Sequence, residues 1–126
     1  MTAAHQIAIG RVYDDPAKSR GARLLVDRVW PRGVSRSALQ LDDWLPDVAP
    51  STQLRKWFGH EEARWERFRE RYLAELEEEP DALARCLEWC RRGPVVLLFA
   101  ARDRERNQAA VLRDHLRALM EKEDAH

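Results

Sequence analysis

The chain of 126 residues contains little cysteine, no excess of either charge and no long hydrophobic run. Its two cysteines, Cys86 and Cys90, stand four residues apart in a helical pattern, which does not favour disulfide geometry. We interpret both as buried thiols. No apolar stretch approaches the roughly 20 residues needed to cross a bilayer, and the N-terminus lacks the basic and apolar regions of a signal peptide. We therefore expect a cytoplasmic protein that makes no contact with a membrane.

The absence of net charge bears on the class of partner. Lysine plus arginine and aspartate plus glutamate each number 22. Proteins that bind duplex DNA usually carry a basic excess, because phosphate neutralisation supplies much of their affinity. The balance argues against nucleic-acid binding, which stays an alternative for the basic and aromatic run at residues 55–58. The sequence also lacks metal-ligand spacing, a Gly-rich phosphate loop and a dinucleotide fingerprint, so it identifies no metal and no cofactor.

Hydrophobic residues make up 44% of the chain, enough for one domain over residues 1–126. We predict strands at residues 5–13, 22–29 and 94–101, and helices at 51–58, 61–79, 80–92 and 104–122. This order predicts an α/β fold with a small, at least partly parallel sheet flanked by helices in a Rossmann-like three-layer arrangement. Only about eight residues separate the first two strands, so a hairpin between them is the simpler interpretation.

Polar residues follow two of the predicted strands. Asp27 and Arg28 end the second strand, with Arg32 shortly after, and Arg102 and Asp103 follow the third. Open α/β sheets bind ligands at the carboxyl ends of their strands, so these residues would gather at one rim. Guanidinium groups could bind a phosphate or carboxylate, and either aspartate could act as acid or base. Equally, Asp103 could cap the last helix, and Asp27 with Arg28 could form a structural ion pair.

A second polar cluster surrounds the predicted helix at residues 51–58. Ser51 fits a helix cap better than a nucleophile, because no Gly-x-Ser-x-Gly motif surrounds it. His60 follows the end of this helix and could reach the rim as a proton shuttle. The chain also contains five tryptophans, which leave a non-catalytic protein-interaction module as an alternative. They are Trp30, Trp44, Trp57, Trp65 and Trp89.

Several motifs resemble a known family. The run LVDRVWPRGV at residues 25–34 is similar to the hallmark of the bacterial domain-of-unknown-function family 488, in its short YeaO-like branch. The segments APST at 49–52, LRKWFGH at 54–60 and LLFAA at 97–101 fit it too, and the resemblance extends over about residues 5–119. It implies no particular activity. The family's recurrent polar residues correspond to Asp27, Arg28, Arg32, Ser51, Arg55, His60, Asp103 and Asn107.

The chain departs from this family at Arg106, where members commonly have a histidine, which puts a mechanism that relies on that histidine in doubt. We expect a protein that binds an anionic small molecule at the strand rim and, if it is an enzyme, uses acid–base chemistry. The expected ligand-binding residues are Arg28, Arg32, Ser51, Arg55 and Asn107. The candidate catalytic residues are Asp27, Asp103 and His60.

Overall fold

The computed structural model describes residues 6–18 and 20–125. Within these residues, four strands form one all-parallel sheet in the order β1-β4-β2-β3. The strands are β1 (Ile7–Arg11), β2 (Ala22–Leu25), β3 (Asp43–Trp44) and β4 (Val95–Phe99). All five residues of β4 are buried, as expected of an unbroken apolar strand with a neighbour on each side. The predicted α/β fold with a parallel sheet is confirmed.

The predicted hairpin between the first two strands is wrong. β4 lies between β1 and β2 and pairs in parallel with both, so that Val95 is opposite Ile7 on one side and Ala22 on the other. The most apolar strand gains most from this central place, because both of its edges are then paired and both of its faces covered. The first strand is also shorter than predicted, and His5 lies outside the described residues.

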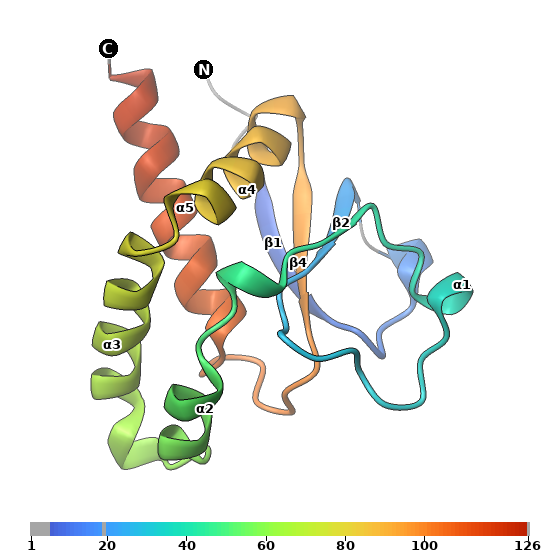
Figure 1. Ribbon diagram of the computed structural model, residues 1–126. Coiled ribbons are helices and arrows are strands. Elements are labelled where there is room, and N and C mark those ends of the chain that lie inside the picture. Colours follow the sequence, from blue (N-terminus) through green and yellow to red (C-terminus); the bar gives the residue numbers. More distant parts are fainter. Residues whose placement is uncertain (1–5, 19, 126) are drawn as a thin grey trace.

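Helices cover the two faces of the sheet unequally (Figure 1). On one face lie α2 (Thr52–Phe58), α3 (Trp65–Glu77), α4 (Pro80–Arg92) and α5 (Gln108–Asp124), and on the other lies the short α1 (Arg36–Leu39). The larger core, which includes Leu24 and Leu97, lies under the four helices. The smaller core includes Leu25 and Leu98 and lies under α1 and the loops beside it. Alternate strand residues therefore face two different layers, which gives the three-layer arrangement.

The ends of α2 are as the sequence predicts. The Ser51 hydroxyl accepts a hydrogen bond from the backbone amide of Leu54 at 3.1 Å, and Gly59 ends the helix in the left-handed conformation at φ 51°. Helix α3 begins only at Trp65, after a single 3-10 turn (Glu62–Arg64). In α4, Cys86 and Cys90 are both buried and free, which confirms the prediction of two buried thiols.

The start of α5 differs from the prediction. Asn107, and not Asp103, caps this helix, because its side-chain oxygen accepts from the backbone amide of Ala110 at 2.8 Å. Asp103 instead accepts hydrogen bonds from the backbone amides of Glu105 and Arg106, at 2.8 and 3.0 Å, which closes a tight turn before the helix. Helix α5 therefore begins at Gln108 rather than at residue 104, and residues 104–107 remain in the loop beyond β4.

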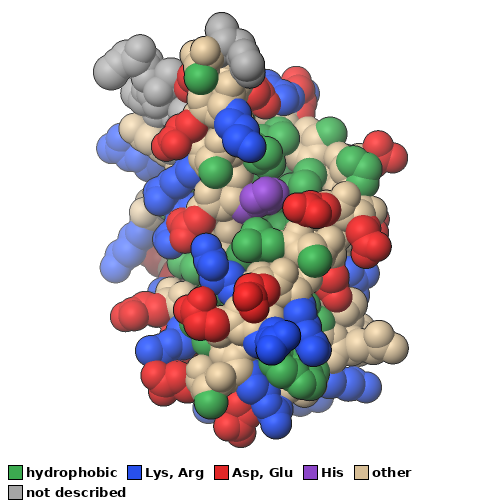
Figure 2. Space-filling view, turned by 90° about the vertical axis from the view of Figure 1, so that its left-hand side faces the viewer, with side chains coloured by type: hydrophobic (Ala, Val, Ile, Leu, Met, Phe, Trp, Pro, Cys, Tyr) green, Lys and Arg blue, Asp and Glu red, His purple; other side chains and the backbone are tan. Residues whose placement is uncertain are grey.

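The outer surface of the helical layer carries both signs of charge. Figure 2 shows acidic and basic side chains interspersed over this face, with no broad area of one sign. None of the helices in the described part of the chain combines the length and apolar character needed to cross a bilayer. Because this face shows no concentration of one charge, we look for a ligand site at the strand ends, where the sequence has its polar residues.

Candidate functional site

A pocket of about 380 Å³ lies beyond the carboxyl ends of β2 and β4, between α2 and the first turn of α5. This volume is within the range of small-molecule sites, and the position is the one at which open parallel sheets bind ligands. Phe58 and Phe68, whose rings stack with centroids 4.5 Å apart, form part of an apolar wall. The polar lining residues are Asp27, Thr52, Arg55, Lys56, His60, Arg106, Asn107 and Gln108.

Asp27 is the carboxylate of this pocket, held two residues beyond the end of β2. One carboxylate oxygen accepts from the backbone amide of Ala100 at 3.0 Å, and the other accepts from the side-chain amide of Gln108. Burial raises the pKa of Asp27 to about 6, although these hydrogen bonds and the charge of Arg55 oppose the rise. Asp27 is therefore fixed in place and titrates within the range in which acid–base groups operate.

Cations line the side of the pocket formed by α2. Arg55 and Lys56 lie in the last turn of this helix, and among the described residues no protein group accepts a hydrogen bond from either side chain. Arg106 also lines the pocket and forms an ion pair with Glu62 at 2.9 Å. The lysine, arginine and aspartate side chains of the lining sum to a formal charge of two positive, and Glu62 offsets the charge of Arg106 from outside the lining. The nearby N-terminus of α5 adds partial positive charge.

Four of the eight residues expected at the site line this pocket: Asp27, Arg55, His60 and Asn107. His60 is exposed, and its backbone adopts φ 59°, so it follows Gly59 in the left-handed region. Asn107 is buried, and its side-chain amide donates to the backbone oxygen of Asp103 at 2.9 Å while its oxygen caps α5. The side chain of Asn107 therefore has partners for both its groups and shapes the wall more than it offers free donors.

Arg28 and Ser51 face a different hollow and serve the packing of α2. Arg28 donates from Nε to the backbone oxygen of Pro50 at 3.2 Å and from Nη2 to that of Ala49 at 3.0 Å. The Ser51 hydroxyl donates to the carboxylate of Glu75 at 2.6 Å in addition to capping the helix. These bonds hold the loop before α2 against the end of β2 and against α3, which fixes the place of Arg55.

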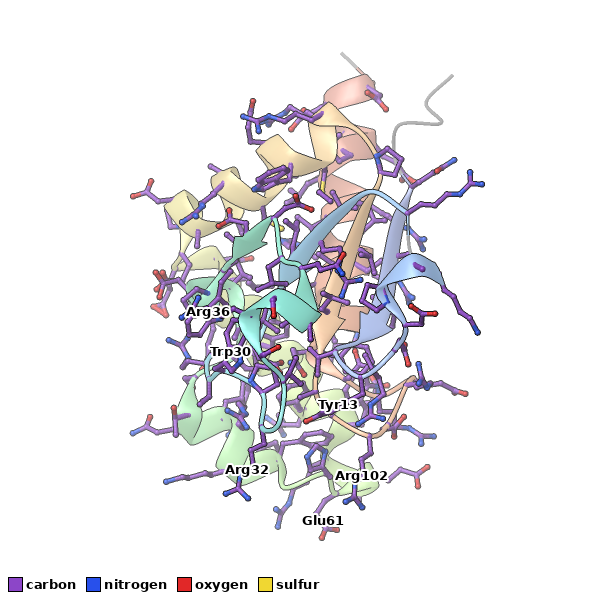
Figure 3. All side chains as sticks on the ribbon, turned by 90° about the vertical axis from the view of Figure 1, so that its right-hand side faces the viewer. Tyr13, Trp30, Arg32, Arg36, Glu61 and Arg102 are labelled. Carbon is purple, nitrogen blue, oxygen red and sulfur yellow. The ribbon has the colours of Figure 1, made fainter. Side chains whose placement is uncertain are left out.

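Arg32 and Asp103 lie at the same end of the molecule as the pocket but do not line it. Figure 3 shows Arg32 and Arg102 extending from this end, with Tyr13 between them. The Tyr13 hydroxyl donates to the backbone oxygen of Arg32 at 3.2 Å. Asp103 is exposed, and its two backbone hydrogen bonds lower its pKa, which makes it a weak base. Asp27 and Asp103 thus share one end of the sheet without sharing a site.

Four polar lining residues were not among the site residues expected from the sequence: Thr52, Lys56, Arg106 and Gln108. Lys56 directly follows the expected Arg55, so its proximity in sequence was a usable signal. Arg106 and Gln108 flank Asn107, and an Asn107 cap recognised in the sequence would have placed all three at the strand ends. The described residues contain no group of three or more histidine, cysteine, aspartate and glutamate side chains that could hold a metal ion.

The five tryptophans pack at the edges of the cores, and each is half-buried. The indole of Trp44 donates to the backbone oxygen of Asp27 at 2.8 Å, and that of Trp89 donates to the carboxylate of Asp43 at 2.9 Å. Buried indoles usually pair their N–H group in this way. Neither Trp44 nor Trp89 therefore forms the exposed aromatic patch that an interaction module would use as an anchor.

Comparison with known proteins identifies relatives along nearly the whole chain. It is 44% identical over 109 residues to the uncharacterized protein YeaO of Escherichia coli, which covers 86% of this chain and 95% of that protein. It is 38% identical over 112 residues to the uncharacterized protein Rv3073c of Mycobacterium tuberculosis, covering 89% and 94%. No solved structure matches. The sequence model of DUF488-N3i, described as the inactive DUF488-N3 subclade, matches residues 6–126, so the chain belongs to the DUF488 family.

Proposed function

We propose that this protein binds a small anionic molecule, carrying a phosphate or a carboxylate, in the pocket at the ends of β2 and β4. The observation that carries the proposal is the pair Arg55 and Lys56, which line the pocket without a protein acceptor among the described residues. A guanidinium group presents a fork of N–H donors that matches planar and tetrahedral oxyanions, and an ammonium group adds a compact charge. Both side chains are exposed, so an anion in the pocket would replace water as their hydrogen-bond acceptor.

The description of the subclade as inactive supports a binding role without turnover. Arg106 agrees with this interpretation, because an arginine always remains protonated in a protein and cannot exchange a proton with a ligand. In the pocket, Arg106 provides a positive charge at the position where members of the family commonly have a titratable histidine. The anion would thus be held by fixed charges, with Asp27 as the one carboxylate among the described residues that line the pocket.

A thermal-shift screen of phosphorylated and carboxylated metabolites tests this function. A ligand at about 100 times its dissociation constant adds roughly 2.7 kcal/mol of stability, which corresponds to several degrees in a domain of this size. We expect at least one ligand to raise the melting temperature of the wild type, and Arg55→Gln to lose most of that shift. Arg69→Gln is the matched control, since Arg69 is exposed on α3 away from the pocket and the substitution removes the same charge.

Equal ligand shifts in Arg55→Gln and Arg69→Gln would place any anion site elsewhere. A wild type that melts cooperatively and responds to no ligand would argue against anion binding altogether.

The position and the raised pKa of Asp27 favour a second candidate function, which is acid–base catalysis. Its carboxylate lies in the same pocket as the cations, and its pKa of about 6 suits proton transfer near neutral pH. His60 lines the pocket as well and could relay the proton to solvent. The test is turnover of any ligand found in the screen, compared between the wild type and Asp27→Asn. Chemical conversion by the wild type, lost in Asp27→Asn while binding is retained, would support catalysis, and unchanged ligand after long incubation would support binding alone.

A further inference from the structure

Apart from Arg106, which forms an ion pair with Glu62, the charged groups of the pocket come from two different parts of its lining. Arg55 and Lys56 come from α2 and provide only donors and positive charge. Asp27 and Gln108 come from the end of β2 and the start of α5 and are joined by a hydrogen bond. Because the Gln108 amide nitrogen donates to Asp27, the Gln108 carbonyl oxygen is left as an acceptor. The second end therefore holds the carboxylate oxygens of Asp27 and the carbonyl oxygen of Gln108 as acceptors, with one N–H of Gln108 left as a donor.

Several acceptor positions at this second end have no protein donor among the described residues. A carboxylate offers about four lone-pair directions, and the described protein groups use one on each oxygen of Asp27, through Ala100 and Gln108. Among the described residues, nothing donates to the carbonyl oxygen of Gln108. Both side chains are half-buried, so water can satisfy these acceptors in the free protein, and a ligand that displaces the water has to replace its hydrogen bonds. A ligand group that lies here must therefore bring hydrogen-bond donors.

Charge decides the kind of donor and the kind of anion. Arg55 and Lys56 together carry two positive charges at the α2 end, which a phosphate dianion matches better than a single carboxylate. The phosphate cannot lie against Asp27, because two negative charges would then face each other. An ammonium group as donor would add positive charge to a lining that already has an excess. Neutral hydroxyl groups satisfy Asp27 and Gln108 without that penalty.

From this segregation we infer that the ligand is a phosphorylated polyol, with its phosphate at Arg55 and Lys56 and its hydroxyl groups at Asp27 and Gln108. This inference rests on the proposed function and narrows it to one class of ligand. The pocket volume of about 380 Å³ leaves room for a carbon chain or ring between the two ends. Phe58 and Phe68 provide the apolar wall along which that middle part would lie.

Calorimetric titration with inorganic phosphate, butyl phosphate and ribose 5-phosphate tests the inference. We expect ribose 5-phosphate to bind the wild type about tenfold more tightly than the other two, as loss of hydrogen bonds to a charged acceptor would give. Gln108→Met keeps the side-chain length and removes the acceptor, so it should abolish most of this advantage and leave the affinity for inorganic phosphate unchanged. Gln53→Met, at an exposed position on α2, is the matched control and should behave as the wild type.

The outcomes separate this inference from the function on which it rests. Equal affinities of the wild type for ribose 5-phosphate and butyl phosphate would overturn the polyol and leave anion binding in place; this comparison requires no variant. Equal losses for all three ligands in Gln108→Met would overturn the assignment of Gln108 to the hydroxyl end. Binding of a carboxylate but of none of the three phosphates would overturn the inference alone, and the absence of any anion binding would overturn both.

Discussion

The side-chain carboxylate of Asp27 accepts a hydrogen bond from the backbone amide of Ala100 at 3.0 Å, across two neighbouring parallel strands. The two residues are 73 positions apart, and each follows the end of its own strand. This bond replaces the next rung of the β2–β4 ladder with a side-chain contact. It thereby holds the Asp27 carboxylate in the pocket lining, where burial raises its pKa and makes the free energy of unfolding depend on its ionisation.

The stability of the protein should depend on the ionisation of Asp27. Burial raises the pKa of this group from 3.8 to about 6, so the folded state binds the proton more tightly than the unfolded state. The resulting stabilisation is complete below about pH 3.8 and is lost as the pH rises through about 6. Relative to Asp27→Asn, which cannot ionise, the wild type should lose roughly 2 kcal/mol of unfolding free energy between pH 4 and 7.

Urea unfolding of both proteins at several pH values measures this difference, and the comparison cancels groups common to the two chains. A difference that stays constant from pH 4 to 7 would show that Asp27 titrates normally and is better solvated than its position indicates.

Gly21 should tolerate a side chain far less well than Gly33. Both adopt positive φ, 94° and 73°, but a Cβ atom at Gly21 would lie 2.2 Å from the backbone oxygen of Pro94, whereas nothing lies within 4 Å of one at Gly33. The strained backbone alone costs about 1 kcal/mol in Gly33→Ala. Gly21→Ala adds a clash at the start of the β2–β4 ladder, where Ala22 donates to Pro94, and should cost roughly 3 kcal/mol or more.

Denaturant unfolding of the two variants gives the comparison directly. Similar losses in both would mean that the backbone around Pro94 moves freely enough to accept the methyl group.

The pKa of Asp14 should depend on Arg104. The guanidinium of Arg104 donates to both carboxylate oxygens, at 2.7 and 3.0 Å, and with the backbone amide of Arg11 it lowers the pKa of Asp14 to about 2. In Arg104→Gln, this pKa should rise most of the way to 3.8, because the largest cause of the shift is gone. Carboxyl carbon shifts followed by NMR through an acid titration report it.

Arg102→Gln is the control for this experiment, because Arg102 is exposed in the same loop and is not bonded to Asp14. An Asp14 pKa that stays near 2 in Arg104→Gln would show that the backbone hydrogen bond alone lowers it.

Patterns local in the chain were enough to predict most of the elements. The apolar run of β4 indicates a buried central strand, and the Ser51 cap and Gly59 stop define α2 to the residue. These predictions hold because each depends on contacts within a few residues. The same reasoning failed for Asp103, which resembles a helix cap, because Asp103 and Asn107 both have side chains suited to that role and only the path of the loop selects between them.

The partners of residues distant in sequence were decided by the tertiary structure alone. From the sequence, Arg28 and Arg55 are equivalent cations near the rim, but the fold brings the carbonyl groups of Ala49 and Pro50 to Arg28 and leaves Arg55 facing the pocket. The sequence by itself determined that polar residues follow apolar strands, which places them at one end of a parallel sheet. Which of them share a pocket depends on strand order and on the packing of α2 against α3, because side chains compete for backbone acceptors that no local pattern reveals.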